Sequence, residues 1–472
     1  MKQINSLSEL STYLTDVVDT SGNGIKILDT DKLQNEIIDI LVYSATFTTD
    51  TKLQNHLRTL IFSLANALNI HPSSINNLYF AIGRGEVKGF TVPAINVRMM
   101  TYDTARVIFQ LIKEHEIGPI IFEIARSEMQ YTFQKPAEYT TSILAAAIKE
   151  GYSGPIFLQG DHFQFSPAKF KEDPAAETDR LKDLIKESIM AGFFNIDIDA
   201  STLVDLSKKD LDEQQKNNYE KSAELTNFIR KIQPSDMTVS IGGEIGHIGG
   251  VNSTTSDFEA FMEGYLKKID TSKMTGMSKV SVQTGTSHGG MPLPGGGVAE
   301  VKLDFNVLKD IGALAREKYN IGGAVQHGAS TLPNELFFNF PVYHTLEIHL
   351  ATGFQNIVYD TMPQELREKM YQWTRENTKS EWKASDTEEQ NIYKTRKKAI
   401  GPFKKELWSL SNSDKAPIRE KLAQQFGFLF KQLNVANTKR IADNFALYSK
   451  TNTISKLTDS AKPEVKVDDL SD

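Results

Sequence analysis

The sequence predicts an α/β protein built as a (β/α)8 TIM barrel, with helical extensions before and after the barrel. From Gly89 onward, short apolar runs rich in Val, Ile and Phe alternate with amphipathic stretches. This alternation is typical of parallel strands that are covered by helices on both faces. There are eight such runs, the number that closes a barrel of this kind. An open dinucleotide-binding sheet would usually show a glycine-rich phosphate loop after an early strand, and none follows the first run.

The predicted strands are too short for helices and nearly continuous in apolar residues. They cover residues 90–97, 119–124, 155–159, 194–199, 238–245, 280–284, 323–326 and 354–359. The segments between them, such as residues 102–116, 138–149 and 178–191, have helical spacing of apolar positions. We therefore assign residues 89–361 to the barrel.

The regions outside the barrel have a different composition. Residues 1–88 are predicted to be helical, because 33–42 and 53–68 carry apolar residues at helical spacing. Residues 362–452 are charge-rich and also predicted to be helical. Residues 453–472 are acidic and lack aromatic residues, so they are predicted to be disordered.

Composition excludes several classes of function. The net charge of −7 provides no basic surface for nucleic acid or for an anionic membrane. With no cysteine among 472 residues, disulfides, thiolate metal sites and cysteine nucleophiles are excluded. No window is apolar enough to span a bilayer, and the first residues lack the apolar run of a signal peptide. We expect a cytoplasmic protein.

Polar side chains gather where the predicted strands end. In order along the chain these are Asp161, His162, Asp197, Asp199, Ser201, Glu244, His288, His327, Asp360 and Thr361. The carboxyl ends of barrel strands meet at one mouth, which is where the active sites of such barrels lie. We therefore expect these side chains to share one site.

Three of these residues, His162, His288 and His327, predict a divalent metal site. Neutral imidazole is a preferred ligand for zinc, and three protein ligands leave a position open for substrate. His247 is a weaker candidate beside the same mouth. The other histidines are expected to pack or to lie on the surface, His344 and His349 because they fall in a predicted helix over residues 336–350; the rest are His56, His71 and His115.

Small residues follow two of the predicted ligands. Gly289 comes after His288, and Gly328 and Ser330 come after His327. Glycine lets backbone N–H groups approach an anion, and a loop after the seventh strand of a barrel is a frequent phosphate site. The alternative is a tight turn between strand and helix. The combination of glycine and histidine favours a phosphate beside a metal.

Five motifs, in order, resemble those of class II fructose-bisphosphate aldolases and their ketose-bisphosphate aldolase relatives. They are residues 158–162 (Leu-Gln-Gly-Asp-His), 192–201 (Gly-Phe-Phe-Asn-Ile-Asp-Ile-Asp-Ala-Ser), 243–250 (Gly-Glu-Ile-Gly-His-Ile-Gly-Gly), 286–289 (Thr-Ser-His-Gly) with Leu-Asp-Phe at 303–305, and 327–330 (His-Gly-Ala-Ser). The resemblance implies a TIM barrel and an aldol reaction that depends on a metal.

Carried over to this sequence, the resemblance makes His162, His288 and His327 the metal ligands. It makes Glu244 a further or alternative ligand and Asp161 the acid/base. Phosphate contacts would come from Gly289, Gly328 and Ser330, with Asp360 and Thr361 nearby. The expected metal is Zn2+, or Mn2+, Co2+ or Fe2+, and relatives often use a monovalent cation by the phosphate.

The resemblance also implies a phosphorylated sugar substrate and a homodimer or homotetramer. The expected reaction is reversible cleavage of fructose 1,6-bisphosphate to dihydroxyacetone phosphate and glyceraldehyde 3-phosphate, as in glycolysis and gluconeogenesis. One alternative is an aldolase for another ketose phosphate, such as tagatose 1,6-bisphosphate. Another is a non-catalytic aldolase-like subunit. A lysine Schiff base is disfavoured, because none of the eight apolar runs contains a lysine.

Three positions depart from the family pattern, and they bear on the substrate rather than on the reaction. The acidic pair expected soon after Gly250 is absent, and Asp257 and Glu259 come later. Val358 replaces the family's strand-eight Asn. At the end of the second strand, Arg126 precedes the Ser, and a guanidinium there could grip phosphate or form a surface salt bridge.

Overall fold

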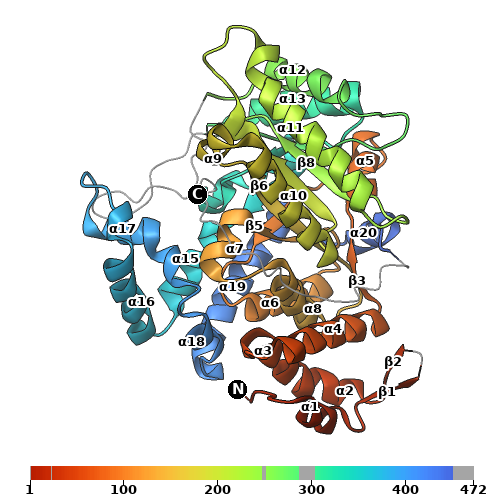
Figure 1. Cartoon of the computed structure of the whole chain (residues 1–472), viewed down its shortest axis with the longest axis vertical. Coiled ribbons are helices and arrows are strands. Elements are labelled where there is room, and N and C mark those ends of the chain that lie inside the picture. Colours follow the sequence, from red (N-terminus) through yellow and green to blue (C-terminus); the bar gives the residue numbers. More distant parts are fainter. Residues whose placement is uncertain (1, 23, 247–250, 286–302, 450–472) are drawn as a thin grey trace.

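The computed structural model describes residues 2–22, 24–246, 251–285 and 303–449. Its centre is a closed barrel of eight parallel strands (Figure 1). The strands are β4 (Val92–Asn96), β5 (Ile121–Ala125), β6 (Gly154–Gln164), β7 (Asn195–Asp199), β8 (Ser240–Glu244), β9 (Lys279–Val282), β10 (Ala324–Gln326) and β11 (Glu347–Leu350). The pairing of β11 with β4 closes the ring. The predicted fold class is confirmed.

Seven predicted strands match the observed ones, but the eighth was wrong. Residues 354–359 lie in helix α15 (Thr352–Thr361), and the last strand is β11, inside the stretch predicted as a helix. The apolar run belongs to the face of α15 that buries Phe354 and Val358. Strand β11 escaped notice because Glu347 and His349 alternate with its two apolar residues.

Helices cover the outside of the barrel between successive strands. They are α6 (Thr101–Glu114), α7 (Arg126–Thr132), α8 (Pro136–Lys149), α9 (Pro167–Glu172), α10 (Pro174–Met190), α11 (Leu211–Ile232), α12 (Thr255–Leu266), α13 (Phe305–Tyr319), α14 (Asn339–Val342) and α15, with short 3-10 turns η2 (Ser201–Leu203), η3 (Ala329–Thr331) and η4 (Asn334–Leu336). Several begin at a side-chain cap, as where Thr254 accepts from the N–H of Asp257 at the start of α12.

The N-terminal extension contains strands as well as the expected helices. Its helical elements are α1 (Leu7–Leu14), α2 (Thr30–Lys32), the π-helix η1 (Leu33–Ile37), α3 (Ile38–Phe47), α4 (Thr51–Ala67) and α5 (Asn76–Gly83). The expected helices are present, and in addition β1 (Val18–Gly22) and β2 (Gly24–Ile27) form an antiparallel hairpin. Strand β3 (Ile70–Ser73) also pairs with the first residues of β6, so the extension is joined to the barrel.

The C-terminal extension packs on the barrel. Its helices are α16 (Gln364–Asn377), α17 (Glu388–Thr395), α18 (Lys404–Trp408), α19 (Asn412–Gln432) and α20 (Lys439–Phe445), with turns η5 (Lys379–Glu381) and η6 (Arg396–Ala399). Helix α19 packs against α6 and α15, where the rings of Phe426 and Phe354 lie 4.4 Å apart. In Figure 1, α16, α17 and α18 lie at the left of the barrel and α1–α4 lie below it. No described helix combines the length and apolarity needed to cross a bilayer.

Candidate active site

Three buried side chains from different strands meet at the carboxyl end of the barrel. They are His162 in β6, Glu244 at the end of β8, and His327 directly after β10. Each offers one ligand atom, and these atoms lie within 4.8 Å of one another. Two imidazole nitrogens and one carboxylate are a donor set that suits zinc and related divalent metals. These residues therefore fit the metal site that the motifs imply.

An irregularity in β6 explains how adjacent residues both reach this site. An unbroken strand points consecutive side chains to opposite faces. The pairing of β6 with β7 shifts register between Gly160 and Phe163, and His162 has a φ of 39°. A Cβ atom on Gly160 would lie 2.4 Å from the Phe163 ring, so glycine makes room for this bulge. Asp161 and His162 can thus both be buried in the mouth.

Carboxylates surround His162 and fix its ring. Its Nδ1 lies 3.0 Å from Oδ2 of Asp199 and 3.1 Å from Oε2 of Glu244. Asp199 is itself held by the Ser201 hydroxyl at 2.7 Å and by the Gln164 amide at 2.6 Å. When one nitrogen of an imidazole binds a metal, the N–H of the other usually donates to a carboxylate, a backbone carbonyl or water. Asp199 and Ser201, singled out by the sequence, therefore support the site.

Burial and neighbouring charges shift the pKa values of these groups. Burial alone would lower the pKa of His162, but Asp161 and Glu244 stabilise its charged form and raise that pKa well above the usual value. Burial, reinforced by repulsion from Asp199, raises the pKa of Glu244 to about 7. The metal-free site therefore holds protons that a metal must displace.

We expect metal affinity to fall steeply as the pH drops below about 7, the pKa of Glu244. A carboxylate binds a metal only when deprotonated, so protonation of Glu244 and of His162 competes with the metal. Titration calorimetry with Zn2+ in two buffers of different ionisation enthalpy would count the protons released. Release of no proton at pH 6.5 would contradict this prediction.

The predicted acid/base, Asp161, lies beside the three metal-binding candidates. Its Oδ2 accepts a hydrogen bond of 2.8 Å from the Asn96 amide, and its Oδ1 lies 3.2 Å from Nδ1 of His349. Burial alone would raise the pKa of Asp161, but the charges of His162 and His349 lower it well below its usual range. Asp161 is therefore ionised at neutral pH and able to accept a proton.

His349 belongs to the site, although the sequence placed it in a helix. It lies in β11 and is buried, and its ring centroid is 3.9 Å from that of His327. Its Nδ1 also lies 3.0 Å from Oε1 of Glu123. Burial would lower the pKa of His349, but Glu123 and Asp161 raise it well above the usual value. The alternation Glu-Ile-His-Leu at 347–350 is the signal that could have revealed this strand.

A lysine also lies inside the barrel, contrary to the sequence-based expectation. Lys279 is the first residue of β9 and directly precedes the predicted run. Its Nζ donates to Asp197 Oδ2 at 2.9 Å, to Gln159 Oε1 at 2.9 Å and to Glu347 Oε1 at 2.5 Å. Burial would lower the pKa of Lys279, but the two carboxylates raise it above its usual value. A Schiff base requires a neutral amine, so this environment disfavours that chemistry.

The loops after β10 and β11 meet beside the metal-binding candidates. Gly328 has a φ of 69°, in the left-handed region that favours glycine. The Gly353 N–H, in the first turn of α15, donates to Oγ of Ser330 at 3.2 Å. The first turn of a helix has free backbone N–H groups, and with a hydroxyl beside it this turn could bind a phosphate.

Asp360 and Thr361 were wrongly placed at the end of a strand. Both lie in the last turn of α15, and Asp360 is exposed. At 1.5 Å per residue, Asp360 lies about 12 Å along the helix from Thr352, which is at the mouth. The error follows from the misplaced eighth strand, and it removes the reason for expecting these two residues at a phosphate.

Arg126 forms a buried ion pair. Its Nη1 lies 2.7 Å from Oε1 of Glu177 and donates to the Gln164 carbonyl at 2.8 Å. Of the two roles that the sequence left open for Arg126, phosphate binding or a salt bridge, the structure shows the salt bridge. The pair is buried and not on the surface as expected. A second arginine at the mouth, Arg98, was missed: its Nη1 donates to Oγ1 of Thr352 at 3.1 Å.

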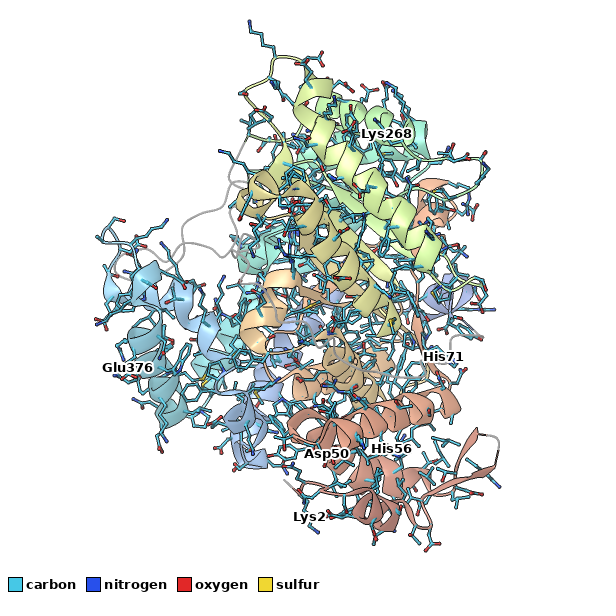
Figure 2. All side chains as sticks on the ribbon, in the orientation of Figure 1. Lys2, Asp50, His56, His71, Lys268 and Glu376 are labelled. Atoms are coloured by element: carbon cyan, nitrogen blue, oxygen red, sulfur yellow. The ribbon has the colours of Figure 1, made fainter. Side chains whose placement is uncertain are left out.

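Some predicted residues lie outside the described part of the chain or away from the site. His247, His288 and Gly289 are not among the described residues. His56 and His71 lie on α4 and β3 in the lower part of Figure 2. His71 is accounted for locally, since its Nε2 lies 3.0 Å from Oδ1 of Asn69 and its ring stacks on Tyr448.

Comparisons with known proteins support the same family as the motifs. The family model described as class-II fructose-bisphosphate aldolase matches residues 78–407. Among curated proteins, no sequence gives a significant match.

Solved structures share the fold at low sequence identity. A fructose-bisphosphate aldolase from Campylobacter jejuni is 16% identical, with 76% of this chain and 94% of that chain covered and a TM-score of 0.46. A probable tagatose 6-phosphate kinase from Sinorhizobium meliloti is 13% identical, with coverage of 72% and 100% and a TM-score of 0.54. The fructuronate-tagaturonate epimerase UxaE from Cohnella laeviribosi is 11% identical, with 90% of each chain covered and a TM-score of 0.51. At these identities, the two likenesses with TM-scores above 0.5 show the fold alone.

Proposed function

The chain belongs to the class II fructose-bisphosphate aldolase family, and from that premise we propose that it is a catalytic, metal-dependent aldolase acting on a ketose bisphosphate. Fructose 1,6-bisphosphate is the proposed substrate, and dihydroxyacetone phosphate and glyceraldehyde 3-phosphate are the products. The observation that carries the proposal is the buried group His162, Glu244 and His327 beside the carboxylate of Asp161. A subunit without catalytic function would have no need to keep these costly buried polar groups together.

The proposed metal ligands are His162, Glu244 and His327, with His288 added from the motif. A bound divalent metal would act as a Lewis acid toward the substrate carbonyl as the carbon–carbon bond breaks. Asp161 takes the proton of the hydroxyl on the carbon that becomes the aldehyde, and returns it in the condensation direction. Asn96 and His349 hold the two carboxylate oxygens of Asp161 and so fix its direction.

We place one substrate phosphate at Gly328, Ser330 and the first turn of α15, together with Gly289 from the motif. The backbone N–H groups of a helix N-terminus and a serine hydroxyl supply donors to an anion. Arg98 supports this turn through Thr352. A phosphate contact by Arg126 is a weaker proposal, because that guanidinium already pairs with Glu177.

A second candidate is an epimerase for a ketose acid. The observation that favours it is length: the likeness to the C. laeviribosi epimerase covers 90% of this chain, so it extends beyond the barrel into both extensions. The two chemistries are related. An epimerase can break the same carbon–carbon bond, let the aldehyde rotate, and re-form the bond on the other face of the aldehyde, which inverts the configuration at that carbon. A carboxylate would then replace the phosphate in the α15 subsite.

A panel assay separates these candidates. Protein stripped by chelation and reloaded with Zn2+, Mn2+, Co2+ or Fe2+ would be tested on fructose and tagatose 1,6-bisphosphate, on their monophosphates, and on fructuronate and tagaturonate. We expect cleavage of a bisphosphate by the reloaded protein, and loss of at least about 99% of activity on chelation. Interconversion of the two uronates without cleavage would select the epimerase. Metal binding without turnover on any substrate would contradict a catalytic role.

A further inference from the structure

The barrel interior beneath the site is filled with charged side chains. Glu123, Asp197, Lys279 and Glu347 are each at most 6% exposed. The interior of a barrel of this kind is usually packed with branched aliphatic residues. Burying charges is costly unless they are paired, and apolar packing would often be at least as stable. Stability alone therefore gives no reason for this arrangement.

Lys279 and Glu347 lie at the centre of this interior. All three N–H groups of the Lys279 ammonium are used, by Glu347, Asp197 and Gln159. Glu347 also contacts two residues besides Lys279. Its Oε1 also lies 2.7 Å from Nε2 of His349, and its Oε2 accepts from the hydroxyl of Tyr79.

The same contacts lead upward to the site. One ring nitrogen of His349 is held by Glu347, and the other faces Oδ1 of Asp161 at 3.2 Å and Oε1 of Glu123 at 3.0 Å. The orientation of this imidazole therefore depends on where Glu347 is held. Lys279 binds the very oxygen of Glu347 that contacts His349. A continuous chain of contacts thus runs from the base of β9 to Asp161.

We propose that Lys279 is a positioning residue for the reaction: through Glu347 it fixes the imidazole of His349, which holds the carboxylate of Asp161. The proposal rests on the proposed function, because it takes Asp161 as the acid/base. Lys279 does not touch substrate and forms no bond with it. The competing explanation is that Lys279 only neutralises two buried carboxylates.

A charge-matched double variant separates these explanations. Lys279→Met alone would remove the ammonium that pairs with two buried carboxylates, so it is combined with Glu347→Gln, which removes one negative charge with the positive one. Should the double variant fail to fold, Lys279→Arg serves, since a guanidinium keeps the positive charge beside Asp197 and Glu347 but not the geometry of the ammonium. Lys268→Met, at an exposed lysine (Figure 2), is the matched control.

We expect the double variant to fold, bind Zn2+ like the wild type, keep its KM, and lose about 10²-fold in kcat, the cost of a misplacement of about 1 Å. A wild-type kcat would overturn the proposal. A second measurement does not depend on activity. Proton NMR of the metal-free protein would record the downfield signals of the imidazole N–H groups. The signals that disappear in His349→Gln are those of His349. We expect these signals to vanish in the double variant and persist in Lys268→Met. If they persist in the double variant, the positioning role is overturned. Absence of wild-type turnover with these signals behaving as expected would count against the proposed function alone.

Discussion

His327→Ala is expected to abolish metal binding and most of the turnover. His327 belongs to two of the three groups of buried potential ligands found among the described residues, one with His162 and Glu244 and one with Asp161 and His349. The ring centroid of His327 lies 4.1 Å from that of His162 and 3.9 Å from that of His349. The substitution therefore removes the imidazole that lies between these two rings. Losing Lewis-acid stabilisation of about 4 kcal/mol corresponds to about a 10³-fold fall in kcat/KM.

The measurement is metal content by elemental analysis alongside the rate of bisphosphate cleavage. The control is His56→Ala, the same substitution at an exposed histidine of α4, which should retain metal and rate. Normal metal content and kcat/KM in His327→Ala would show that the metal site is built from other residues.

The second large effect is expected for Asp161→Asn, which should reduce kcat by about 10²–10⁴-fold while metal content stays at the wild-type level. The amide has nearly the shape of the carboxylate but cannot take the substrate hydroxyl proton. The partner Asn96 remains in place, and His349 keeps its contacts with Glu123 and Glu347. Folding should therefore be preserved.

Asp360→Asn is the matched control for Asp161→Asn. The sequence motifs had placed Asp360 near the substrate, whereas the structure places it at the exposed end of α15. Steady-state kinetics should show wild-type kcat and KM for Asp360→Asn. A kcat loss in that variant as large as in Asp161→Asn would mean that the last turn of α15 belongs to the site after all. Near-normal kcat in Asp161→Asn would exclude it as the acid/base.

The fold was predictable where strands are apolar and was missed where the barrel interior is polar. Runs such as the one that became β4 stand out because Val92, Ala94 and Ile95 are apolar, and the structure buries all of this strand. Strand β11 has the same burial but contains Glu347 and His349, so its sequence does not look like a core strand. The apolar positions of α15 formed a short run that hydrophobicity alone could not distinguish from a strand.

The polar interior of the barrel also limited the prediction of the site. His162, Glu244 and His327 lie in or directly after strands that the sequence predicted, and the structure brings them together. His349 and Lys279 could not be assigned, because their roles depend on partners distant in the sequence, such as Glu123 and Asp197. Such long-range charge pairing leaves no local pattern in the sequence.

The most direct test of the central proposal is where the metal binds. Crystals of the zinc-loaded protein, measured on both sides of the zinc absorption edge, would locate the metal by anomalous scattering. We predict one strong peak at the carboxyl end of the barrel, within bonding distance of His162, Glu244 and His327 or of the two histidines together with His288. A catalytically active protein whose metal peak lies elsewhere, or that shows no peak, would contradict this account.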